Sequence, residues 1–271
     1  VRNMAERNTI TNLTLLQMKA RGEKIVSVTA YDASFAVQLE EAGVEVLLVG
    51  DSLGMVIQGH QSTLPVVLTD MIYHSACVAR VAKSALRIVD MPFMSYASVD
   101  QALENAARLM REGGAHMVKL EGGRRIAGIV QALSEHGIPV CAHLGLTPQS
   151  VHQLGGYRLQ GRDDETAARL QEEALLLEQS GASVLVLECI PADLARRISE
   201  QLRIPTIGIG AGADCDGQVL VLYDLLGITP GRKPRFSMDY LQKATGVQDA
   251  LRTFVNDVKE GRFPDAEHSF L

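Results

Sequence analysis

Short apolar runs alternate with longer amphipathic stretches along most of the chain. Each run is rich in β-branched or aliphatic residues and ends at a polar or glycine-containing stop. Most runs are apolar throughout, as strands covered on both faces must be. The pattern occurs eight times and predicts strands at residues 24–29, 44–50, 86–89, 116–120, 139–143, 183–187, 206–210 and 218–223.

The stretches between these runs have helical periodicity. They predict helices at residues 34–42, 70–82, 100–111, 124–135, 165–179 and 192–201. Several end at a glycine, which supplies the left-handed residue that closes a helix. Eight strand–helix units in series, with no GxGxxG fingerprint after the first strand, favour an α/β fold of the closed (β/α)8 TIM-barrel type over an open doubly wound sheet.

Two segments outside the repeat predict additional helices. Residues 11–21 form a short amphipathic segment before the first strand, and residues 238–259 supply one or two closing helices after the eighth. Either segment is expected to cover the barrel floor or a neighbouring subunit. No linker or low-complexity tract marks a boundary, so we expect one barrel domain over residues 1–271.

Composition and charge restrict the class of protein. Of the 271 residues, 46% are hydrophobic and 21% are charged, which is enough to bury a sizeable core. The net charge of −6 argues against a dedicated nucleic-acid binder. No apolar run is long enough for a membrane span, and the four cysteines are scattered. We therefore expect a cytoplasmic protein with neither a membrane nor a nucleic-acid partner.

Polar residues follow six consecutive predicted strands. The C-terminal ends of barrel strands form the active site in this fold. The residues at these ends are Tyr31 and Asp32, Asp51 and Ser52, Asp90, Lys119 and Glu121, His143, and Glu188. Taken singly, Asp32 is more typical of a helix cap than of a ligand.

Asp51 and Asp90 directly end aliphatic runs that aim them into the barrel mouth. An ionised carboxylate there is costly without a cation or another partner. A few oxygen ligands completed by water are typical of magnesium, whereas zinc draws on more His or Cys. Asp51, Asp90 and Glu121 therefore form a candidate hard-metal site.

Lys119, His143 and Glu188 are candidates for binding and proton transfer. Lys119 lies on the same strand face as Glu121, so it could neutralise a substrate carboxylate, form a Schiff base or pair with Glu121. His143 could polarise a carbonyl or hold an enolate oxygen, or it could be a core histidine bonded to backbone. Glu188 ends an apolar run and is the best general-base candidate; the competing role is to cap the helix that follows Pro191.

Seven motifs in order resemble the ketopantoate hydroxymethyltransferase family. They are VGDSLGM at 49–55, QGHQSTLPV at 58–66, DMPFMSY at 90–96, MVKLEGG at 117–123, HLGLTPQS at 143–150, VLECIP at 186–191 and IGIGAG at 207–212. The resemblance runs from about residue 11 to the EHSF near the C-terminus.

The resemblance implies a magnesium-dependent, cytoplasmic enzyme of pantothenate biosynthesis. It would transfer a one-carbon unit from 5,10-methylenetetrahydrofolate to α-ketoisovalerate (3-methyl-2-oxobutanoate), giving ketopantoate through a metal-stabilised enolate. The family assembles as a homo-oligomer, typically a decamer. By the same resemblance Asp51 and Asp90 would bind Mg²⁺ and the ketoacid, with Glu121 close to the metal.

The resemblance and the enolate chemistry together suggest roles in ketoacid binding and proton transfer for four other rim residues. By resemblance, Ser52 and Lys119 would bind the ketoacid and Glu188 would accept the C3 proton. His143 and Lys119 would share the enolate charge with the metal. Residues that contact folate have no sharp motif, and the loops 147–162 and 207–212 are candidates. The glycine-rich loop 207–212 equally suits a tight turn or a phosphate-binding loop, although Asp214 and Asp216 disfavour a phosphate.

Three other functions are compatible with parts of this pattern. A magnesium-dependent carbon–carbon lyase of the isocitrate-lyase type uses the same metal–enolate chemistry on a 2-oxoacid. A metal-free aldolase would use Lys119 as a Schiff-base residue. A catalytically inactive barrel could serve as an assembly partner, but it would have no reason to keep a charged rim.

Overall fold

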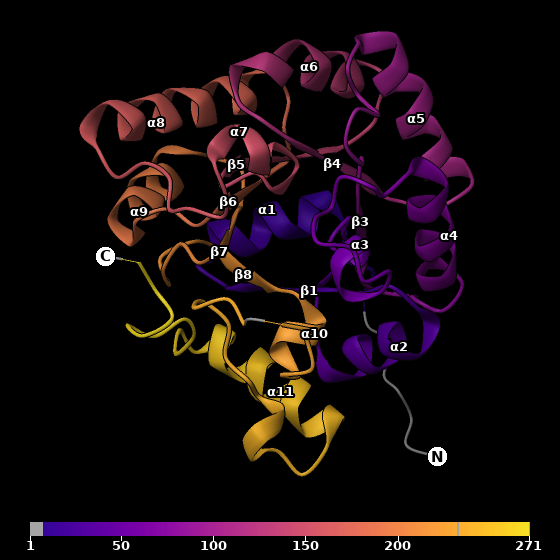
Figure 1. The fold of residues 1–271 in the computed structure, drawn as a ribbon, viewed down its shortest axis with the longest axis vertical. Coiled ribbons are helices and arrows are strands. Elements are labelled where there is room, and N and C mark those ends of the chain that lie inside the picture. The colour runs from indigo at the N-terminus through magenta and orange to yellow at the C-terminus, as the bar shows by residue number, and fades with distance from the viewer. Residues whose placement is uncertain (1–7, 232, 271) are drawn as a thin grey trace.

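Eight parallel strands form one closed barrel in chain order, with β8 hydrogen-bonded to β1 (Figure 1). The structure, a computed structural model, describes residues 8–231 and 233–270. The closed ring confirms the predicted (β/α)8 fold class. The strands are β1 (Ile25–Thr29), β2 (Val46–Val49), β3 (Leu86–Asp90), β4 (Met117–Glu121), β5 (Val140–Gly145), β6 (Val184–Glu188), β7 (Thr206–Ile209) and β8 (Gly217–Leu220).

Helices surround the ring of strands (Figure 1). The α-helices are α1 (Asn12–Ala20), α2 (Ala33–Ala42), α3 (Leu53–Val56), α4 (Leu68–Ala79), α5 (Val99–Arg111), α6 (Ala127–Glu135), α7 (Val151–Leu154), α8 (Asp164–Gln179), α9 (Ala192–Gln201), α10 (Leu222–Leu225) and α11 (Val247–Lys259). Short 3-10 turns form η1 (Arg124–Ile126), η2 (Pro148–Ser150) and η3 (Leu241–Lys243). Within the described ranges, no helix is both long and apolar enough to cross a membrane.

Helix α2 shows how local sequence fixes an element. The Asp32 side chain accepts a hydrogen bond from the backbone N–H of Phe35 at 3.0 Å, which satisfies a donor at the helix start. Gly43 ends the helix with a φ of 111°. The face that carries Leu39 is buried in the core of the protein. The interpretation of Asp32 as a helix cap is therefore confirmed.

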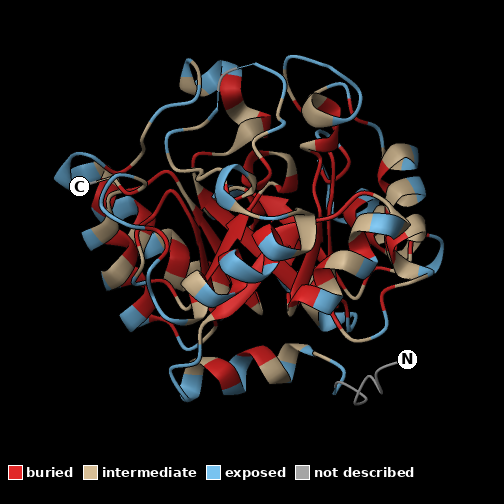
Figure 2. Cartoon of the chain, turned by 90° about the horizontal axis from the view of Figure 1, so that it is seen from below, coloured by how far each residue is buried: buried red, intermediate tan, exposed pale blue. Residues whose placement is uncertain are grey.

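Helix α1 closes the end of the barrel at which the strands begin, and Figure 2 shows it lying across that end. Its Leu15 and Met18 are buried and pack against inward-facing strand residues such as Ile25 and Met117. The predicted N-terminal helix is thus present, and it covers the barrel floor.

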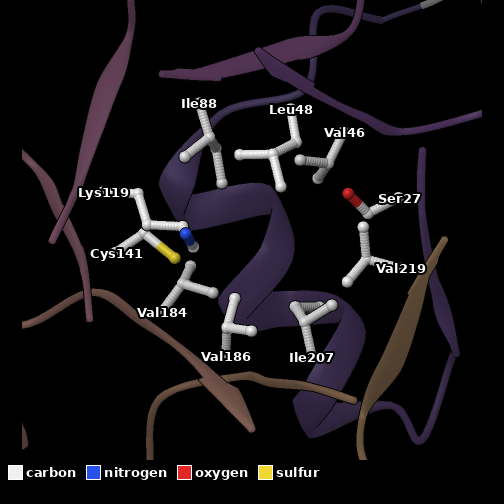
Figure 3. A pocket seen from close by; sticks show the side chains of 10 residues that line it. All are labelled: Ser27, Val46, Leu48, Ile88, Lys119, Cys141, Val184, Val186, Ile207 and Val219. Carbon is white, nitrogen blue, oxygen red and sulfur yellow. The ribbon is translucent and has the colours of Figure 1, made fainter. Parts of the chain in front are cut away.

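Above α1 the barrel interior is filled by side chains from all the strands (Figure 3). They leave a cavity of about 10 Å³, which is lined by Ser27, Val46, Leu48, Ile88, Lys119, Cys141, Val184, Val186, Ile207 and Val219. Such a space is no larger than a single water requires. A substrate must therefore bind above this layer, at the C-terminal ends of the strands.

The last two strands differ from the prediction. Strand β8 ends at Leu220 instead of residue 223, because the backbone N–H of Leu222 donates to Thr29 Oγ1 and α10 begins there. No helix follows β7; residues 210–216 return directly to β8. Gly210 and Gly212 allow this close passage, since a Cβ at these positions would collide with Phe236 and Ala192 respectively.

Other element boundaries also differ from the predicted ranges. The predicted helix at 124–135 divides into η1 and α6, and the one at 70–82 runs from Leu68 to Ala79. The C-terminal segment at 238–259 forms η3 and α11, and α11 packs on α2 and β1. The short helices α3 and α7 lie in loops after β2 and β5, where the sequence pattern predicted no helix.

Candidate active site

The predicted polar residues meet at the C-terminal ends of β2 to β6, here called the rim. Strand register brings them together: Asp90 is paired with Lys119 across β3 and β4, and Glu121 with His143 across β4 and β5. Lys119 Nζ donates to Asp90 Oδ1 at 2.6 Å, and both side chains are 5% exposed. Glu121 lies farther from this ammonium, at 4.0 Å. The main ion-pair partner of Lys119 is therefore Asp90 and not, as the sequence suggested, Glu121.

Asp51 lies beside this pair just after β2. Its backbone N–H donates to Asp90 Oδ2 at 3.0 Å, and its side chain is buried together with those of Asp90 and Glu121. Burial and the repulsion from Asp90 and Glu121 raise the pKa of Asp51 well above its usual value, despite the nearby charge of Lys119. The rim therefore carries a surplus of buried negative charge.

Lys119 is held as an ammonium ion. Burial lowers its pKa, but the carboxylates of Asp90, Glu121 and Asp51 outweigh burial and raise the pKa above its ordinary value. A Schiff base requires a neutral amine as the nucleophile. This environment does not match the Schiff-base alternative.

His143 is buried between two carboxylates. Its Nδ1 lies 3.5 Å from Glu121 Oε1 and its Nε2 lies 3.2 Å from Glu188 Oε2, yet neither contact has the alignment of a hydrogen bond. Burial and Lys119 lower the pKa of His143, but the two carboxylates outweigh them and raise it to about 9. His143 is thus an imidazolium at neutral pH, which differs from the alternative of a core histidine bonded to backbone.

Glu188 ends β6 with its side chain 14% exposed at the rim. Its carbonyl oxygen accepts the backbone N–H of Leu146 at 2.8 Å, and a Cβ at Gly145 would overlap that same oxygen. Gly145 has a φ of 93°, so glycine is needed there to let β5 and β6 approach. Helix α9 begins at Ala192 with Pro191 as its N-cap and has no side-chain cap hydrogen bond, so the capping role considered for Glu188 is wrong.

Ser52 is positioned at the same rim by its neighbours. Its Oγ lies 2.8 Å from the hydroxyl of Tyr31, which follows β1. A Cβ on Gly50 would lie 2.8 Å from the Ser52 Oγ, so the glycine lets the serine hydroxyl fold back over the end of β2. Ser52 is therefore adjacent to Asp51 and held by a buried tyrosine.

Two site residues were missed because they do not end a predicted strand. Gln149 in η2 donates from Nε2 to Asp51 Oδ2 at 2.8 Å, and Tyr96 donates to Gln149 Oε1 at 2.5 Å. Both belong to the quoted motifs DMPFMSY and HLGLTPQS, but a single sequence gives no reason to prefer them over the other loop residues.

The loop 147–162 lies over the rim. Gln160 donates its backbone N–H to the carbonyl of Cys189 at 2.9 Å, next to Glu188. The hydroxyl of Tyr157 lies 3.6 Å from Met55 Sδ, in the helix that follows Ser52. The loop thereby spans from the β6 side of the rim to the β2 side.

The donor set fits a divalent cation held by few protein ligands. Among the described residues, the ion-pair contacts of these four carboxylates, Asp51, Asp90, Glu121 and Glu188, involve two cationic side chains, Lys119 and His143, and most of the carboxylates are buried. Oxygen donors are those that magnesium prefers, and it usually takes one or two carboxylates plus water and substrate oxygens. Across residues 8–231 and 233–270, no group of three His, Cys, Asp or Glu side chains is arranged to hold a metal ion. Glu121 Oε2 already accepts the backbone N–H of Gln149 at 2.9 Å.

The sequence is similar to known proteins over nearly its whole length. The family model described as ketopantoate hydroxymethyltransferase matches residues 9–266. The chain belongs to this family. A relative from Nitrosococcus oceani named 3-methyl-2-oxobutanoate hydroxymethyltransferase is 58% identical over 261 residues, which cover 96% of this chain and 99% of the relative. Membership of the ketopantoate hydroxymethyltransferase family identifies the chain as a hydroxymethyltransferase and decides against the lyase and the inactive barrel.

Solved structures show the same fold at low sequence identity. Phosphonopyruvate hydrolase in complex with oxalate and Mg²⁺ matches with a TM-score of 0.59 at 11% identity, over 78% of this chain and 80% of that one. The 2,3-dimethylmalate lyase, described as a PEP mutase/isocitrate lyase superfamily member, matches with a TM-score of 0.57 at 21% identity, over 82% and 84%. At these identities the likeness concerns the barrel fold alone.

Proposed function

We propose that the enzyme transfers a hydroxymethyl group from 5,10-methylenetetrahydrofolate to α-ketoisovalerate, giving ketopantoate and tetrahydrofolate. The acceptor is supported by the name of the relative, since 3-methyl-2-oxobutanoate is the same compound. The observation that carries the proposal is the arrangement of the rim. Buried Asp51 and Asp90 stand at the ends of β2 and β3, and the partly exposed Glu188 stands at the end of β6.

Asp51 and Asp90 would hold Mg²⁺, which fits the surplus of buried carboxylates around them. When bound, Mg²⁺ supplies Lewis-acid polarisation of the ketoacid carbonyl, which acidifies the C3 proton. The further prediction that Glu121 binds the ion would be met by its Oε1, because its Oε2 already accepts the backbone N–H of Gln149. Phosphonopyruvate hydrolase, a solved structure of the same fold, is a complex with oxalate and Mg²⁺, which supports a role for this cation in a barrel of this kind.

Glu188 would remove the C3 proton of the ketoacid. It is the carboxylate at the rim with the greatest exposure, and its backbone is fixed by Leu146 and Gly145. The negative charge left on the ketoacid oxygen would be stabilised by the ammonium of Lys119 and by the imidazolium of His143, whose ring nitrogens lack a well-aligned partner. Ser52 and Lys119 would bind the ketoacid carboxylate.

The carbanion at C3 would then form a bond to the methylene carbon of the folate. Both bonds between that carbon and the folate nitrogens break, and water supplies the hydroxyl group. The remaining water proton and the C3 proton taken up by Glu188 would go to the two nitrogens, and tetrahydrofolate leaves. The loop 147–162 is the stronger candidate for the folate contact, because Tyr157 presents a half-exposed ring beside the rim. In the loop 207–212, the glycines are required for packing against Phe236 and Ala192, which favours the tight-turn interpretation there.

A cytoplasmic homo-oligomer, with a decamer as the expected size, is also part of this proposal. The assembly is supported by exposed apolar side chains, which include Tyr73 on α4 and Phe93 and Met94 in the loop after β3.

The proposed reaction can be tested by product analysis. Purified protein is incubated with α-ketoisovalerate, 5,10-methylenetetrahydrofolate and Mg²⁺, and ketopantoate and tetrahydrofolate are quantified by mass spectrometry. We expect equal amounts of both products, none without folate and none with EDTA. Formation of no ketopantoate, or equal formation in EDTA, would refute the reaction or its metal dependence.

A further inference from the structure

Gln149 joins two of the rim carboxylates, each through one hydrogen bond. It is 7% exposed and lies in η2, directly after β5. Its Nε2 donates to Asp51 Oδ2 at 2.8 Å and to the carbonyl oxygen of Met91 at 2.9 Å. Its backbone N–H donates to Glu121 Oε2 at 2.9 Å. One residue therefore contacts both Asp51 and Glu121.

The orientation of the Gln149 amide is determined by its partners. The Met91 carbonyl can only accept, so the amide nitrogen must face it. The opposite oxygen, Oε1, accepts the hydroxyl proton of Tyr96 at 2.5 Å, and the Tyr96 oxygen accepts the backbone N–H of Glu121 at 3.3 Å. Both amide hydrogens are used, and a flip of the amide would break every one of its side-chain bonds.

This arrangement holds the Asp51 carboxylate by one of its two oxygens. In the described part of the chain, no hydrogen bond reaches the other oxygen, Oδ1. We propose that Gln149 is a positioning residue that turns Asp51 so that its carboxylate is presented to the divalent cation. The inference rests on the proposed function, because it takes Asp51 to be a ligand of that cation.

Loss of a hydrogen bond that orients a metal ligand weakens metal binding. Removal of a residue that holds a ligand without touching the metal itself typically lowers metal affinity by about 10- to 100-fold. Asp51 is buried, so solvent cannot replace the lost amide hydrogen bond, and its carboxylate would be free to rotate toward Asp90 or away from the rim. A role limited to stability would lower the melting temperature and leave the affinity for the ion unchanged.

The test is calorimetric titration of the full-length protein with MgCl₂ alone. Q149M keeps the volume of the side chain and removes both amide donors, and Y96F removes the group that fixes the amide. The matched control is Q131M, at an exposed position on α6. We expect Q149M to raise the Kd for Mg²⁺ by about 10- to 100-fold. We expect a smaller rise for Y96F and no change for Q131M, with all variants folded by circular dichroism.

The titrations distinguish failure of the positioning role of Gln149 from failure of the proposed Mg²⁺ site. If the wild type binds Mg²⁺ and folded Q149M binds it within twofold of the wild type, the positioning role is wrong while the proposed metal site stands. If the wild type binds no Mg²⁺, both are wrong. If Q149M does not fold, Y96F decides, and an unchanged Kd in Y96F overturns the inference.

Discussion

Lys119 Nζ lies 2.6 Å from Asp90 Oδ1, and this ion pair is buried at the centre of the rim. The contact follows from the register of β3 and β4, which pairs these two residues across the sheet. The same carboxylate accepts the backbone N–H of Asp51 through its other oxygen. Asp90 therefore connects the cationic side chain of the site to the backbone of a second proposed ligand, so its removal affects both chemistry and folding.

Asp90→Ala should abolish Mg²⁺-dependent turnover and also reduce stability. The substitution leaves the buried Lys119 ammonium without its hydrogen-bonded carboxylate and with Glu121 at 4.0 Å, and breaking a buried pair costs about 3–5 kcal/mol. Asp90→Asn keeps an acceptor for Lys119 and should be the more stable of the two inactive variants. Urea unfolding of the metal-free proteins measures the difference.

The control for this comparison is Asp193→Ala, which removes an exposed ion pair with Arg196. It should change stability far less than Asp90→Ala does, because water and salt screen an exposed pair. An Asp90→Ala protein as stable as the wild type would show that the buried Lys119 ammonium does not need Asp90 as its counter-charge.

Glu188→Gln should bind ketoacid and Mg²⁺ but lose proton abstraction, because the amide is not a base. Turnover should fall by about 10²- to 10⁴-fold. Calorimetric titration with α-ketoisovalerate in the presence of Mg²⁺ checks that binding is retained, and Glu200→Gln on the exposed face of α9 serves as the control. Turnover equal to that of the wild type would exclude Glu188 as the base.

The stability of the metal-free protein should fall as pH rises, and His143 should account for part of that fall. Its pKa is raised from 6.5 to about 9 in the folded protein, so protonation stabilises the fold fully below about pH 6.5. That stabilisation is lost as the pH rises through about 9, and it amounts to at most about 3 kcal/mol.

His143→Gln removes this titration. Unfolding free energies measured in EDTA between pH 6 and pH 10 should therefore decrease more steeply for the wild type than for His143→Gln. Parallel curves for the two proteins would mean that His143 is not held as an imidazolium by Glu121 and Glu188.

Leu15→Ala should destabilise the barrel through its floor. Leu15 is fully buried between α1 and the strand residues, so its truncation should cost about 2–5 kcal/mol. Leu13 lies on the same helix but is 61% exposed, and Leu13→Ala should change stability by less than about 0.5 kcal/mol. Equal effects of the two substitutions would contradict the role of α1 as a packed floor.

The sequence predicted most of the barrel because strands covered on both faces leave uninterrupted apolar runs. It failed where that signal is ambiguous. The apolar run after residue 217 continues from β8 into α10, and periodicity alone does not separate a short buried strand from a short buried helix. The count of eight strand–helix units implied a helix after every strand, whereas the chain returns from β7 to β8 without one.

The rim residues were predictable because all parallel strands present their C-terminal ends on one side of a barrel. Their partners were not, since these depend on register between strands. The pairing of Lys119 with Asp90 and the position of His143 between two carboxylates follow from that register. Gln149 and Tyr96 reach the site from loops, where no periodic pattern marks an inward-facing side chain.

The central claim is that Glu188 removes the C3 proton of α-ketoisovalerate with a cation at Asp51 and Asp90. It is tested most directly by proton NMR of α-ketoisovalerate in heavy water with the purified protein, with and without Mg²⁺, and again after addition of tetrahydrofolate. We predict loss of the C3 proton signal that requires Mg²⁺, stops in EDTA and is absent with Glu188→Gln. Persistence of the C3 signal in every sample, including those with tetrahydrofolate, or equal exchange by Glu188→Gln, would contradict this mechanism.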